Sequence, residues 1–382
     1  MNRHLHIISF SVPYPVDYGG AIDIFYRIKA LHAAGIQIHL HCFEYGREEQ
    51  PELEQYCYSV QYYERNTGHK GVSNTLPYIV SSRKNEKLLQ DLLKDDHPIL
   101  LEGVHCTYLL FDKRFAERKC FVRLHNAEFR YYQDLGRSSS SLLRKLYYTV
   151  ESRLLKSYEK KIASKAAFIA VAKKDMEVYR DELGCSEINY LPVFIPDWKV
   201  ECMEGMGCYC LYHGDLSVDA NEKAATWLLE KVFSKLSVPF VICGKNPSEK
   251  LYALAQANGR TCIVANPSNK EMQDMIAKAH INVLPSYTTP GIKFKLLNAL
   301  FNGRHCVVND ATVAGSGLES ACHIGTTANA FTEIIAQLYH QPLGMEEFEL
   351  RRKLLSSSFD NEKGTQWVIG KIWGEDQLIV NN

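Results

Sequence analysis

The regular alternation of short apolar runs with longer amphipathic runs constrains the fold of this chain more than any other feature. In the N-terminal half, we expect strands at residues 4–11, 36–43, 98–103, 120–126, 166–172 and 188–194. In the C-terminal half, the expected strands are 208–215, 239–245, 262–266, 281–285 and 305–309. Amphipathic helices are expected in most of the gaps. This order predicts an α/β protein whose parallel sheets are covered by helices on both faces.

Two domains are expected, because 382 residues exceed what one hydrophobic core usually holds. The stretch 191–207 contains two prolines, two glycines and no clear period, so we interpret it as the linker. Two doubly wound, Rossmann-like domains of similar size should then face each other across a cleft. In such sheets, ligands bind outside the carboxyl ends of the strands.

Composition and spacing argue against several classes of protein. The 44 basic residues balance 44 acidic ones, so we expect no nucleic-acid partner. No apolar run approaches the ~20 residues of a membrane-spanning helix, and the N-terminus shows no signal-peptide core, which predicts a cytoplasmic protein. The sequence has neither CxxC nor HExxH spacing, so we expect no metal site. Buried free thiols are expected in the strand-like runs, at Cys42, Cys120, Cys243, Cys262 and Cys306.

Two lysines, Lys293 and Lys295, stand where the first turn of a helix over 291–303 is expected, after Pro290 and Gly291. The partial positive charge at a helix N-terminus repels cations, so an anion is expected nearby. Helix-start amides and two ammonium groups would suit a diphosphate. The equally favoured alternative is that both lysines simply extend from a packed helix into solvent.

Two other loops in the C-terminal half carry polar or flexible residues. Gly214 and Asp215 close a strand, Asn221 is expected to cap the next helix, and Lys223 would lie in its first turn. Lys223 could reach a phosphate or lie at the solvated surface. Gly317 would allow a ligand close to the backbone, or would only form a turn.

The N-terminal half offers two candidate segments. Gly19 and Gly20 precede a helix without forming a GxGxxG fingerprint, and an ordinary tight turn is the favoured interpretation. His125 and Asn126 end an apolar strand, where a general base could face the cleft. A lone histidine in such a place is more often structural than catalytic.

Taken together, these segments resemble the retaining glycosyltransferases of family 4 (glycosyl transferases group 1), which have the GT-B fold. The resemblance covers nearly the whole chain and rests mainly on five segments in the right order. They are PYPVDYGGAIDIFYRIKAL, HNAEFRYYQDL, HGDLSVDANEKAATWL, GIKFKLLNALFNGRHCVV and GSGLE. This fold implies a last helix that crosses back to the N-terminal domain, anchored by Trp367 and Trp373. We therefore divide the chain into 1–195, the acceptor domain, 196–360, the donor domain, and 361–382, the crossing helix.

The resemblance implies roles for the matching residues. His125 would lie near the transferred sugar, and Lys293 and Lys295 would lie at the donor diphosphate; these three are the expected catalytic residues. Substrate-binding roles are expected for Gly19, Gly20, Asn126, Gly214, Asp215, Lys223, Gly291, Asn298 and Gly317.

The sequence departs from the family pattern at three positions. Pro290 and Asn298 replace two glutamates that family members often carry, and Asp215 stands near the place of a frequent arginine. Asn298 matches the glutamate that binds the nucleotide ribose. An asparagine there would cost about 1–2 kcal/mol of donor binding, because it replaces a charged acceptor.

The resemblance implies retaining, metal-independent transfer of a sugar from a nucleotide-sugar to a hydroxyl group. The donor is a substrate, and no cofactor is expected. The acceptor would be a sugar or lipid-linked sugar in bacterial surface polysaccharide or glycolipid synthesis. The alternatives are a catalytically silent relative that serves as a scaffold, and another enzyme of the same fold, such as a sugar-nucleotide epimerase or a phosphorylase.

The segment 137–165 raises the possibility of membrane contact. It carries eight basic residues against two acidic ones, interleaved with apolar and aromatic residues. A basic amphipathic stretch of this kind can rest on an anionic membrane surface, here the inner face of the membrane. The slightly favoured alternative is a solvated helix packed on the first domain.

Overall fold

The computed structural model describes residues 3–139, 141–203 and 205–374. They form two compact units. Unit 1 groups the chain up to residue 132 with 149–196 and with the segment that starts at 359. Unit 2 groups 133–148 with 197–358. Each unit is described by itself.

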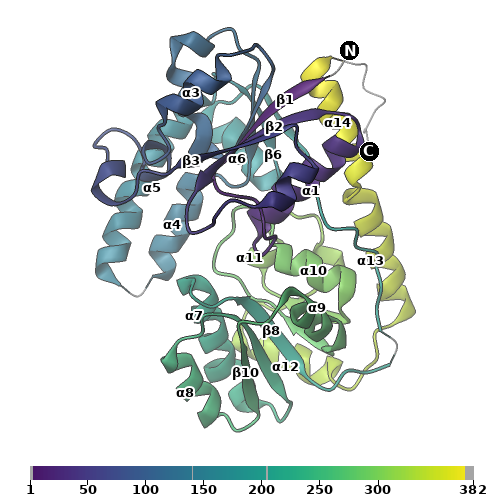
Figure 1. Cartoon of the computed structure of the whole chain (residues 1–382). Helices are drawn as coiled ribbons and strands as arrows, with labels where there is room; N and C mark the ends of the chain where they lie inside the picture. The colour runs from purple at the N-terminus through teal and green to yellow at the C-terminus, as the bar shows by residue number, and fades with distance from the viewer. Residues whose placement is uncertain (1–2, 140, 204, 375–382) are drawn as a thin grey trace. The chain divides into compact units, whose positions relative to one another are not determined.

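Unit 1 is built on a seven-stranded parallel sheet with the order β3-β2-β1-β4-β5-β6-β7 (Figure 1). Its strands are β1 (His4–Ser9), β2 (Gln37–Glu44), β3 (Ser59–Glu64), β4 (Ile99–Glu102), β5 (Cys120–Leu124), β6 (Ala167–Ala170) and β7 (Ile188–Tyr190). Its helices are α1 (Gly19–Ala33), α2 (Tyr78–Ser81), α3 (Glu86–Leu92), α4 (Glu128–Ser138), α5 (Leu142–Ile162), α6 (Lys173–Leu183) and α14 (Asn361–Trp373). The tip of the α4–α5 hairpin falls in unit 2.

Unit 2 has a six-stranded parallel sheet with the order β10-β9-β8-β11-β12-β13. Its strands are β8 (Cys210–Asp215), β9 (Phe240–Lys245), β10 (Thr261–Ala265), β11 (Ile281–Val283), β12 (His305–Val308) and β13 (His323–Ile324). Its helices are α7 (Asp219–Trp227), α8 (Glu249–Ala257), α9 (Asn269–Lys278), α10 (Phe294–Asn302), α11 (Asp310–Val313), α12 (Ala328–Leu338) and α13 (Met345–Ser358).

The predicted architecture is confirmed, since both sheets are parallel and each expected strand is present, most of them slightly shorter than predicted. Two strands were missed. β3 lies at a sheet edge and mixes polar with aromatic residues, and β13 has only two residues. The expected burial of Cys262 is wrong, because this thiol lies in the edge strand β10 and is exposed.

The last helix, α14, belongs to unit 1, where it lies along α1 (Figure 1). Val368, Ile369 and Ile372 enter the apolar core that α1 shares with β1 and β2. Trp367 and Trp373 pack against the same core while partly buried. The end of the described chain is thereby built into the N-terminal sheet layer.

Candidate functional site

In both units, some of the predicted site residues follow the strands at which the order of strands reverses, whereas His125 and Asn126 follow β5 and Gly317 follows β12. In unit 1 the reversal lies between β1 and β4, and in unit 2 between β8 and β11. Loops that leave the carboxyl ends of such neighbouring strands diverge and leave a crevice in which ligands bind. The loop after β1 leads to Gly19, and the loop after β11 leads to Lys293.

His125 directly follows β5, and a buried carboxylate holds its imidazole. The Nε2 atom of His125 lies 2.9 Å from Oε2 of Glu102, the last residue of β4. The His125 side chain is 12% exposed, while that of Glu102 is fully buried. The ring of Phe10 meets the imidazole edge-on, with 5.6 Å between the ring centres. A carboxylate partner fixes the tautomer and leaves Nδ1 as the nitrogen that can accept a hydrogen bond.

Sequence reasoning missed the buried ion network that holds Glu102. Arg27 donates to Glu102 and, at 2.7 Å, to Asp23 on the preceding turn of α1. Arg123 in β5 donates to both Asp23 oxygens at 3.1 Å and to two backbone carbonyl groups at 191–192. Burial alone would raise the pKa of Asp23, but the guanidinium groups of Arg123 and Arg27 outweigh it and hold that pKa well below its ordinary value. The network thus joins α1, β4 and β5 beneath His125.

The spacing of Asp23, Glu102 and His125 would also suit a metal ion, since one ligand atom of each lies within 4.8 Å of the others. The donor set does not fit one. Arg27 and Arg123 already bind both Asp23 oxygens and one Glu102 oxygen, and His125 lies against the other, so no carboxylate oxygen is left for a cation. We interpret this group as a set of ion pairs that supports His125.

Asn126 belongs to a second polar group at the end of β5. Its Nδ2 atom donates to Oε1 of Glu128 at 3.2 Å. Burial raises the pKa of Glu128 to about 7, and the carboxylate of Asp175 adds to that rise. Asn126 therefore positions a carboxyl group whose protonation can change near neutral pH.

Gly19 and Gly20 begin α1, and packing explains the second of them. A Cβ atom on Gly20 would come within 2.9 Å of the Tyr18 ring and 3.0 Å of the Phe10 ring. The Tyr18 hydroxyl is itself held by a hydrogen bond to the hydroxyl of Ser11. The absent side chain of Gly20 thus makes room for the ring of Tyr18, the residue that precedes the helix.

In unit 2, α10 begins later than expected. Gly291 has φ of 68°, and Lys293 is the N-cap residue, with extended backbone angles. The left-handed backbone at Gly291 cannot continue into a helix, so the prediction that both lysines lie in the first turn is wrong for Lys293. Its ammonium group turns back and donates to the carbonyl oxygen of Pro290 at 2.5 Å.

Lys295 lies in the first turn of α10 and reaches toward β8. Its Nζ atom is 3.4 Å from Oδ1 of Asn221 and 5.0 Å from the centre of the Tyr212 ring. Burial lowers the pKa of Lys295 to about 7, and the neighbouring charge of Lys293 adds to this effect. Within the described part of the chain, Lys295 has no carboxylate partner. A partly buried ammonium beside an amide oxygen and an aromatic face is poised to bind an anion.

Asn298 lies one turn further along the same helix. Its Oδ1 atom accepts a hydrogen bond from Nδ2 of Asn302 at 2.9 Å. An amide oxygen has two lone pairs, so one remains for a ligand. A ribose at this position would therefore share its acceptor with Asn302.

The turn after β8 is held by its own side chains. Asp215 accepts from the backbone N–H and the hydroxyl of Ser217, at 3.0 Å and 2.6 Å. The expected capping role of Asn221 is wrong, because Val218 is the N-cap residue. Asn221 instead donates to the carbonyl oxygen of Asp215 at 2.9 Å and joins this turn to Lys295.

Three predicted residues of unit 2 remain to be described, and of these Gly214 and Lys223 contact neighbouring side chains. A Cβ atom on Gly214 would touch the Asn221 amide at 3.4 Å. Lys223 is exposed, with its ammonium group 4.7 Å from the centre of the Tyr287 ring. Gly317 is exposed and has φ of 72°, so its turn requires glycine.

Some of the missed residues left a signal in the sequence. Asp23 and Arg27 stand four residues apart on a helix that is otherwise apolar on its buried side, and Arg123 interrupts an apolar strand. Buried charges in such places require partners. Tyr212 and Tyr287 could not be recognised as site residues from the sequence, because an aromatic residue in a strand or loop is ordinary.

Known proteins resemble this chain in sequence. Residues 207–341 match the family model described as Glycosyl transferases group 1. A relative from Klebsiella pneumoniae, described as "Uncharacterized 44.6 kDa protein in cps region", is 26% identical over 328 residues, which cover 81% of this chain and 84% of the relative.

Solved structures resemble the chain over nearly its full length. WaaG, a glycosyltransferase involved in lipopolysaccharide biosynthesis, has a TM-score of 0.68 at 13% identity, covering 97% of this chain and 100% of WaaG. TarM has a TM-score of 0.69 at 10% identity, and the match covers 97% of this chain and 98% of TarM. Anabaena Alr3699/HepE, solved with UDP and glucose, has a TM-score of 0.64 at 11% identity, covering 97% and 100%. The chain has the GT-B fold and resembles the group 1 glycosyltransferases, whose family model covers the segment that carries Lys293 and Lys295.

Proposed function

We propose that this protein is a retaining glycosyltransferase that moves a sugar from a nucleotide-sugar to a hydroxyl group of a sugar or lipid-linked sugar. Lys295 is the observation that carries the proposal. Its side chain is partly buried, its pKa is lowered to about 7, and its described neighbours provide no anion. The diphosphate of a nucleotide-sugar would supply that anion at the start of α10.

The relatives support this choice of substrate class. Alr3699/HepE was solved with UDP and glucose, WaaG acts in lipopolysaccharide biosynthesis, and the Klebsiella relative is encoded in a cps region. From these three relatives we propose that the protein acts in bacterial surface polysaccharide or glycolipid synthesis.

Electrostatic stabilisation of the leaving group would be the main catalytic effect. The bond between the anomeric carbon and the diphosphate breaks, and the same carbon bonds to the acceptor oxygen on the same face. The acceptor proton leaves with the diphosphate or passes to solvent. Lys293, Lys295 and the first amides of α10 would stabilise the negative charge on the diphosphate, which removes the need for a metal ion. His125, fixed through Glu102, would orient the sugar or acceptor through Nδ1.

The proposal is tested by incubating the protein with a panel of nucleotide-sugars and lipid-linked or free sugar acceptors. Transfer is detected as release of the nucleoside diphosphate together with a new glycosidic product, whose anomeric configuration NMR establishes. Product of inverted configuration would contradict retention, and the absence of binding to every donor would contradict the assignment of the diphosphate site.

Donor affinity is expected to fall as the pH rises above about 7. A bound diphosphate favours the ammonium form, so the pKa of Lys295 must be higher in the complex than the value of about 7 in the free protein. Below both pKa values the ammonium is present in both states and affinity is unaffected. Between them, each pH unit costs up to about tenfold in affinity. Calorimetry with a nucleotide-sugar, whose phosphates do not titrate in this range, measures the effect from pH 6 to 9.

The matched control for this pH dependence is Lys295→Arg, because a guanidinium stays protonated over the whole range. Calorimetry in buffers of different ionisation enthalpy should also detect proton uptake on binding at pH 8 by the unmodified protein. A flat affinity from pH 6 to 9 without proton uptake would contradict the assigned role of Lys295.

The second candidate function is a catalytically silent scaffold, and Asn298 is the observation that favours it. Its amide has no charge and already accepts from Asn302. Calorimetry with nucleoside diphosphates separates the candidates: no binding of UDP, GDP or ADP would favour the scaffold.

The tip of α5 is expected to bind anionic membranes. Leu142 and Leu143 are each 81% exposed and Leu146 is 64% exposed, with Arg144 and Lys145 among them. No helix in the described part of the chain is long and apolar enough to cross a bilayer. We expect co-sedimentation with vesicles that contain anionic lipid at low salt, because each inserted leucine contributes about 1.5–3 kcal/mol and each nearby basic residue about 1 kcal/mol.

The variant Leu142→Glu/Leu143→Glu should lower this vesicle binding at least tenfold. Vesicles of neutral lipid serve as the control for the charge. Equal sedimentation of the variant and the unmodified protein would contradict membrane contact through this tip.

A further inference from the structure

Three groups of histidine and carboxylate side chains in the described residues bring their ligand atoms within 4.8 Å of one another. They are Asp23, Glu102 and His125; His4, His39 and His97; and His305, His323 and Glu347. The first is already neutralised by two arginines. The other two differ in how well their hydrogen-bonding needs are met.

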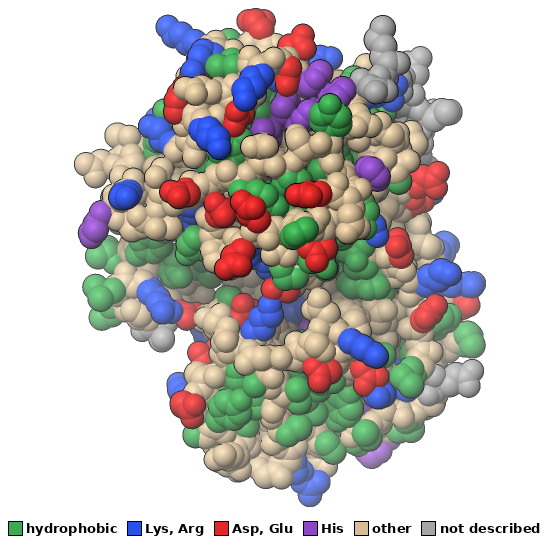
Figure 2. Space-filling model, viewed as in Figure 1, with side chains coloured by type: hydrophobic (Ala, Val, Ile, Leu, Met, Phe, Trp, Pro, Cys, Tyr) green, Lys and Arg blue, Asp and Glu red, His purple; other side chains and the backbone are tan. Residues whose placement is uncertain are grey.

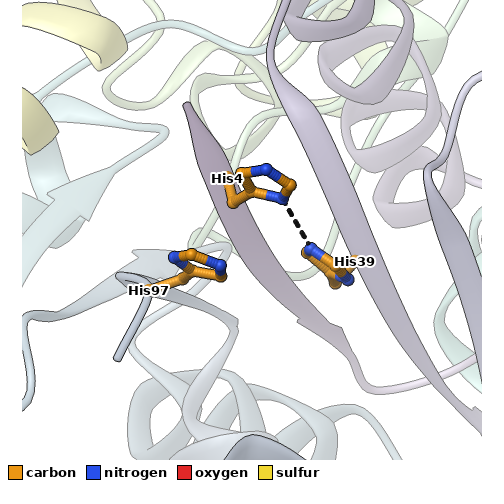
Figure 3. A group of neighbouring side chains, drawn as sticks. All are labelled: His4, His39 and His97. Carbon is orange, nitrogen blue, oxygen red and sulfur yellow. Dashed lines mark hydrogen bonds between the residues drawn. The ribbon is translucent and has the colours of Figure 1, made fainter. Parts of the chain in front are cut away.

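The second group forms part of a histidine patch on the surface of unit 1 over β1 and β2 (Figure 2). His4 and His39 form a hydrogen bond with 2.9 Å between Nδ1 and Nε2 (Figure 3). Nδ1 of His39 also bonds to Ser59 at 3.0 Å. His97 stacks on His4, with 4.6 Å between ring centres and 12° between ring planes. Stacked parallel rings do not direct their lone pairs to one point, so this patch is poorly arranged to coordinate an ion.

The third group lies in unit 2 and converges on one oxygen atom. His305 is the first residue of β12, His323 is the first of β13, and Glu347 lies in α13. Nδ1 of His305 is 3.5 Å and Nε2 of His323 is 3.4 Å from the same atom, Oε2 of Glu347. These separations are too long for good hydrogen bonds.

The protonation of His305 makes this arrangement unusual. Its Nε2 atom lies 2.9 Å from the carbonyl oxygen of Gln341, which can only accept, so Nε2 carries the proton. In the neutral ring, Nδ1 is then a bare lone pair that faces a carboxylate. Nδ1 of His305 and Nε2 of His323 are both buried without a hydrogen-bond partner. Facing acceptors of this kind are costly unless a cation lies between them.

The surroundings hold the carboxylate in place for such a cation. Arg351, on the next turn of α13, donates to the other oxygen of Glu347 and is only 1% exposed. Its second nitrogen donates to the carbonyl oxygens of Gly303 and Arg304. The arginine and Gln341 thus orient Glu347 and His305 from outside, as the neighbours of metal ligands commonly do.

We propose that His305, His323 and Glu347 bind a divalent transition-metal ion, with Zn²⁺ the best fit, that ties α13 to the starts of β12 and β13. Tetrahedral Zn²⁺ with bonds of about 2.0–2.1 Å to nitrogen and oxygen separates neighbouring ligand atoms by about 3.3–3.4 Å. The two nitrogen-to-oxygen distances already match that spacing. Two imidazoles and one carboxylate leave a fourth position for water, and His323, one-third exposed, gives access from solvent.

The proposed ion is structural and independent of the proposed sugar transfer. It would lie at the amino ends of β12 and β13, whereas Lys295 belongs to the carboxyl ends of strands in the same parallel sheet. Loss of the ion should therefore weaken unit 2 without removing the diphosphate site.

The test uses the full chain, stripped of metal by a chelator under reducing conditions and titrated with Zn²⁺ against a chromophoric chelator. We expect one Zn²⁺ per chain at this site, and a higher melting temperature when it is bound. Glu347→Gln keeps the shape of the side chain, and His323→Ala removes the more exposed ligand. Each should weaken Zn²⁺ binding by about 100-fold or more, since even indirect partners of metal ligands are worth 10–100-fold.

Two matched variants locate the ion. His97→Ala removes a member of the histidine patch in unit 1, and His340→Ala removes an exposed histidine of unit 2; neither should change the affinity. When Co²⁺ replaces Zn²⁺, we expect visible absorption bands typical of a Co²⁺ ion with a low coordination number. The variant Glu347→Gln should abolish these bands. Unchanged Zn²⁺ affinity in Glu347→Gln, loss of binding in His97→Ala instead, or no binding at all would each overturn the proposal.

Discussion

Replacing Lys295 with methionine is expected to lower kcat/KM for sugar transfer by about 100-fold or more, since removal of one preorganised electrostatic group commonly costs 10²–10³ in rate. Methionine keeps an unbranched apolar side chain in the buried space and removes only the charge. The effect should fall mainly on kcat if the ammonium stabilises the departing diphosphate, and on donor affinity if it only binds the ground state. Steady-state kinetics with the best donor of the panel separates these outcomes.

The same variant should be at least as heat-stable as the unmodified protein. Burying an ammonium without an anion costs stability, as the lowered pKa of Lys295 records. Lost activity with an equal or higher melting temperature would thus exclude misfolding as the cause. Lys250→Ala, an exposed position in α8, is the control for a general loss of positive charge. Unaltered kinetics in Lys295→Met would place the donor elsewhere.

The fold was predictable because its signal is repeated many times along the chain. Each buried strand of a parallel sheet is a short apolar run, and each helix has an amphipathic period. That order located the carboxyl ends of the strands, near which His125 and Lys295 lie, whereas the roles expected for both residues came from the family resemblance. The strand β13 has only two residues, which are too few to show an apolar run in the sequence.

The details of the site depend on contacts between distant segments, which periodicity does not encode. The helix α10 begins later than predicted because Gly291 adopts a left-handed conformation. Lys293 is therefore the N-cap residue and does not lie in the first turn. Asn221 looked like a cap but joins the β8 turn to Lys295, which follows it by 74 positions. The hydrogen-bond partner of His125 is Glu102 in β4, and Arg27 of α1 binds Glu102 in turn. Sequence could suggest that Asp23 and Arg27 need partners, but not which ones.

Replacing Asp23 with asparagine should lower the free energy of unfolding of unit 1 by about 3–5 kcal/mol, the usual cost of removing one partner of a buried ion pair. Asp23 binds Arg27, Arg123 and the backbone N–H of Phe194, so one change leaves two buried guanidinium groups with a single counter-charge, that of Glu102. Calorimetry, which can resolve separate transitions of two units, measures the loss. Asp181→Asn, at an exposed pair with Arg180, is the control and should cost no more than about 1 kcal/mol.

Acid titration provides an independent measure of the same network. The pKa of Asp23 is lower in the folded state than in the unfolded state, because Arg123 and Arg27 outweigh the effect of burial. Its stabilising contribution is therefore complete above the unfolded pKa of about 3.9 and is lost as the pH falls toward the folded value. In Asp23→Asn, the free energy of unfolding should fall less steeply with decreasing pH below about 4, and it should also be lower at neutral pH.

In Asp23→Leu/Arg123→Met, which removes one charge of each sign, the loss of unfolding free energy should be smaller than the sum of the losses in the two single variants, because the uncompensated charge disappears. Additive losses would mean that the two residues contribute packing alone, and the ion network would then not be what fixes Glu102 beneath His125.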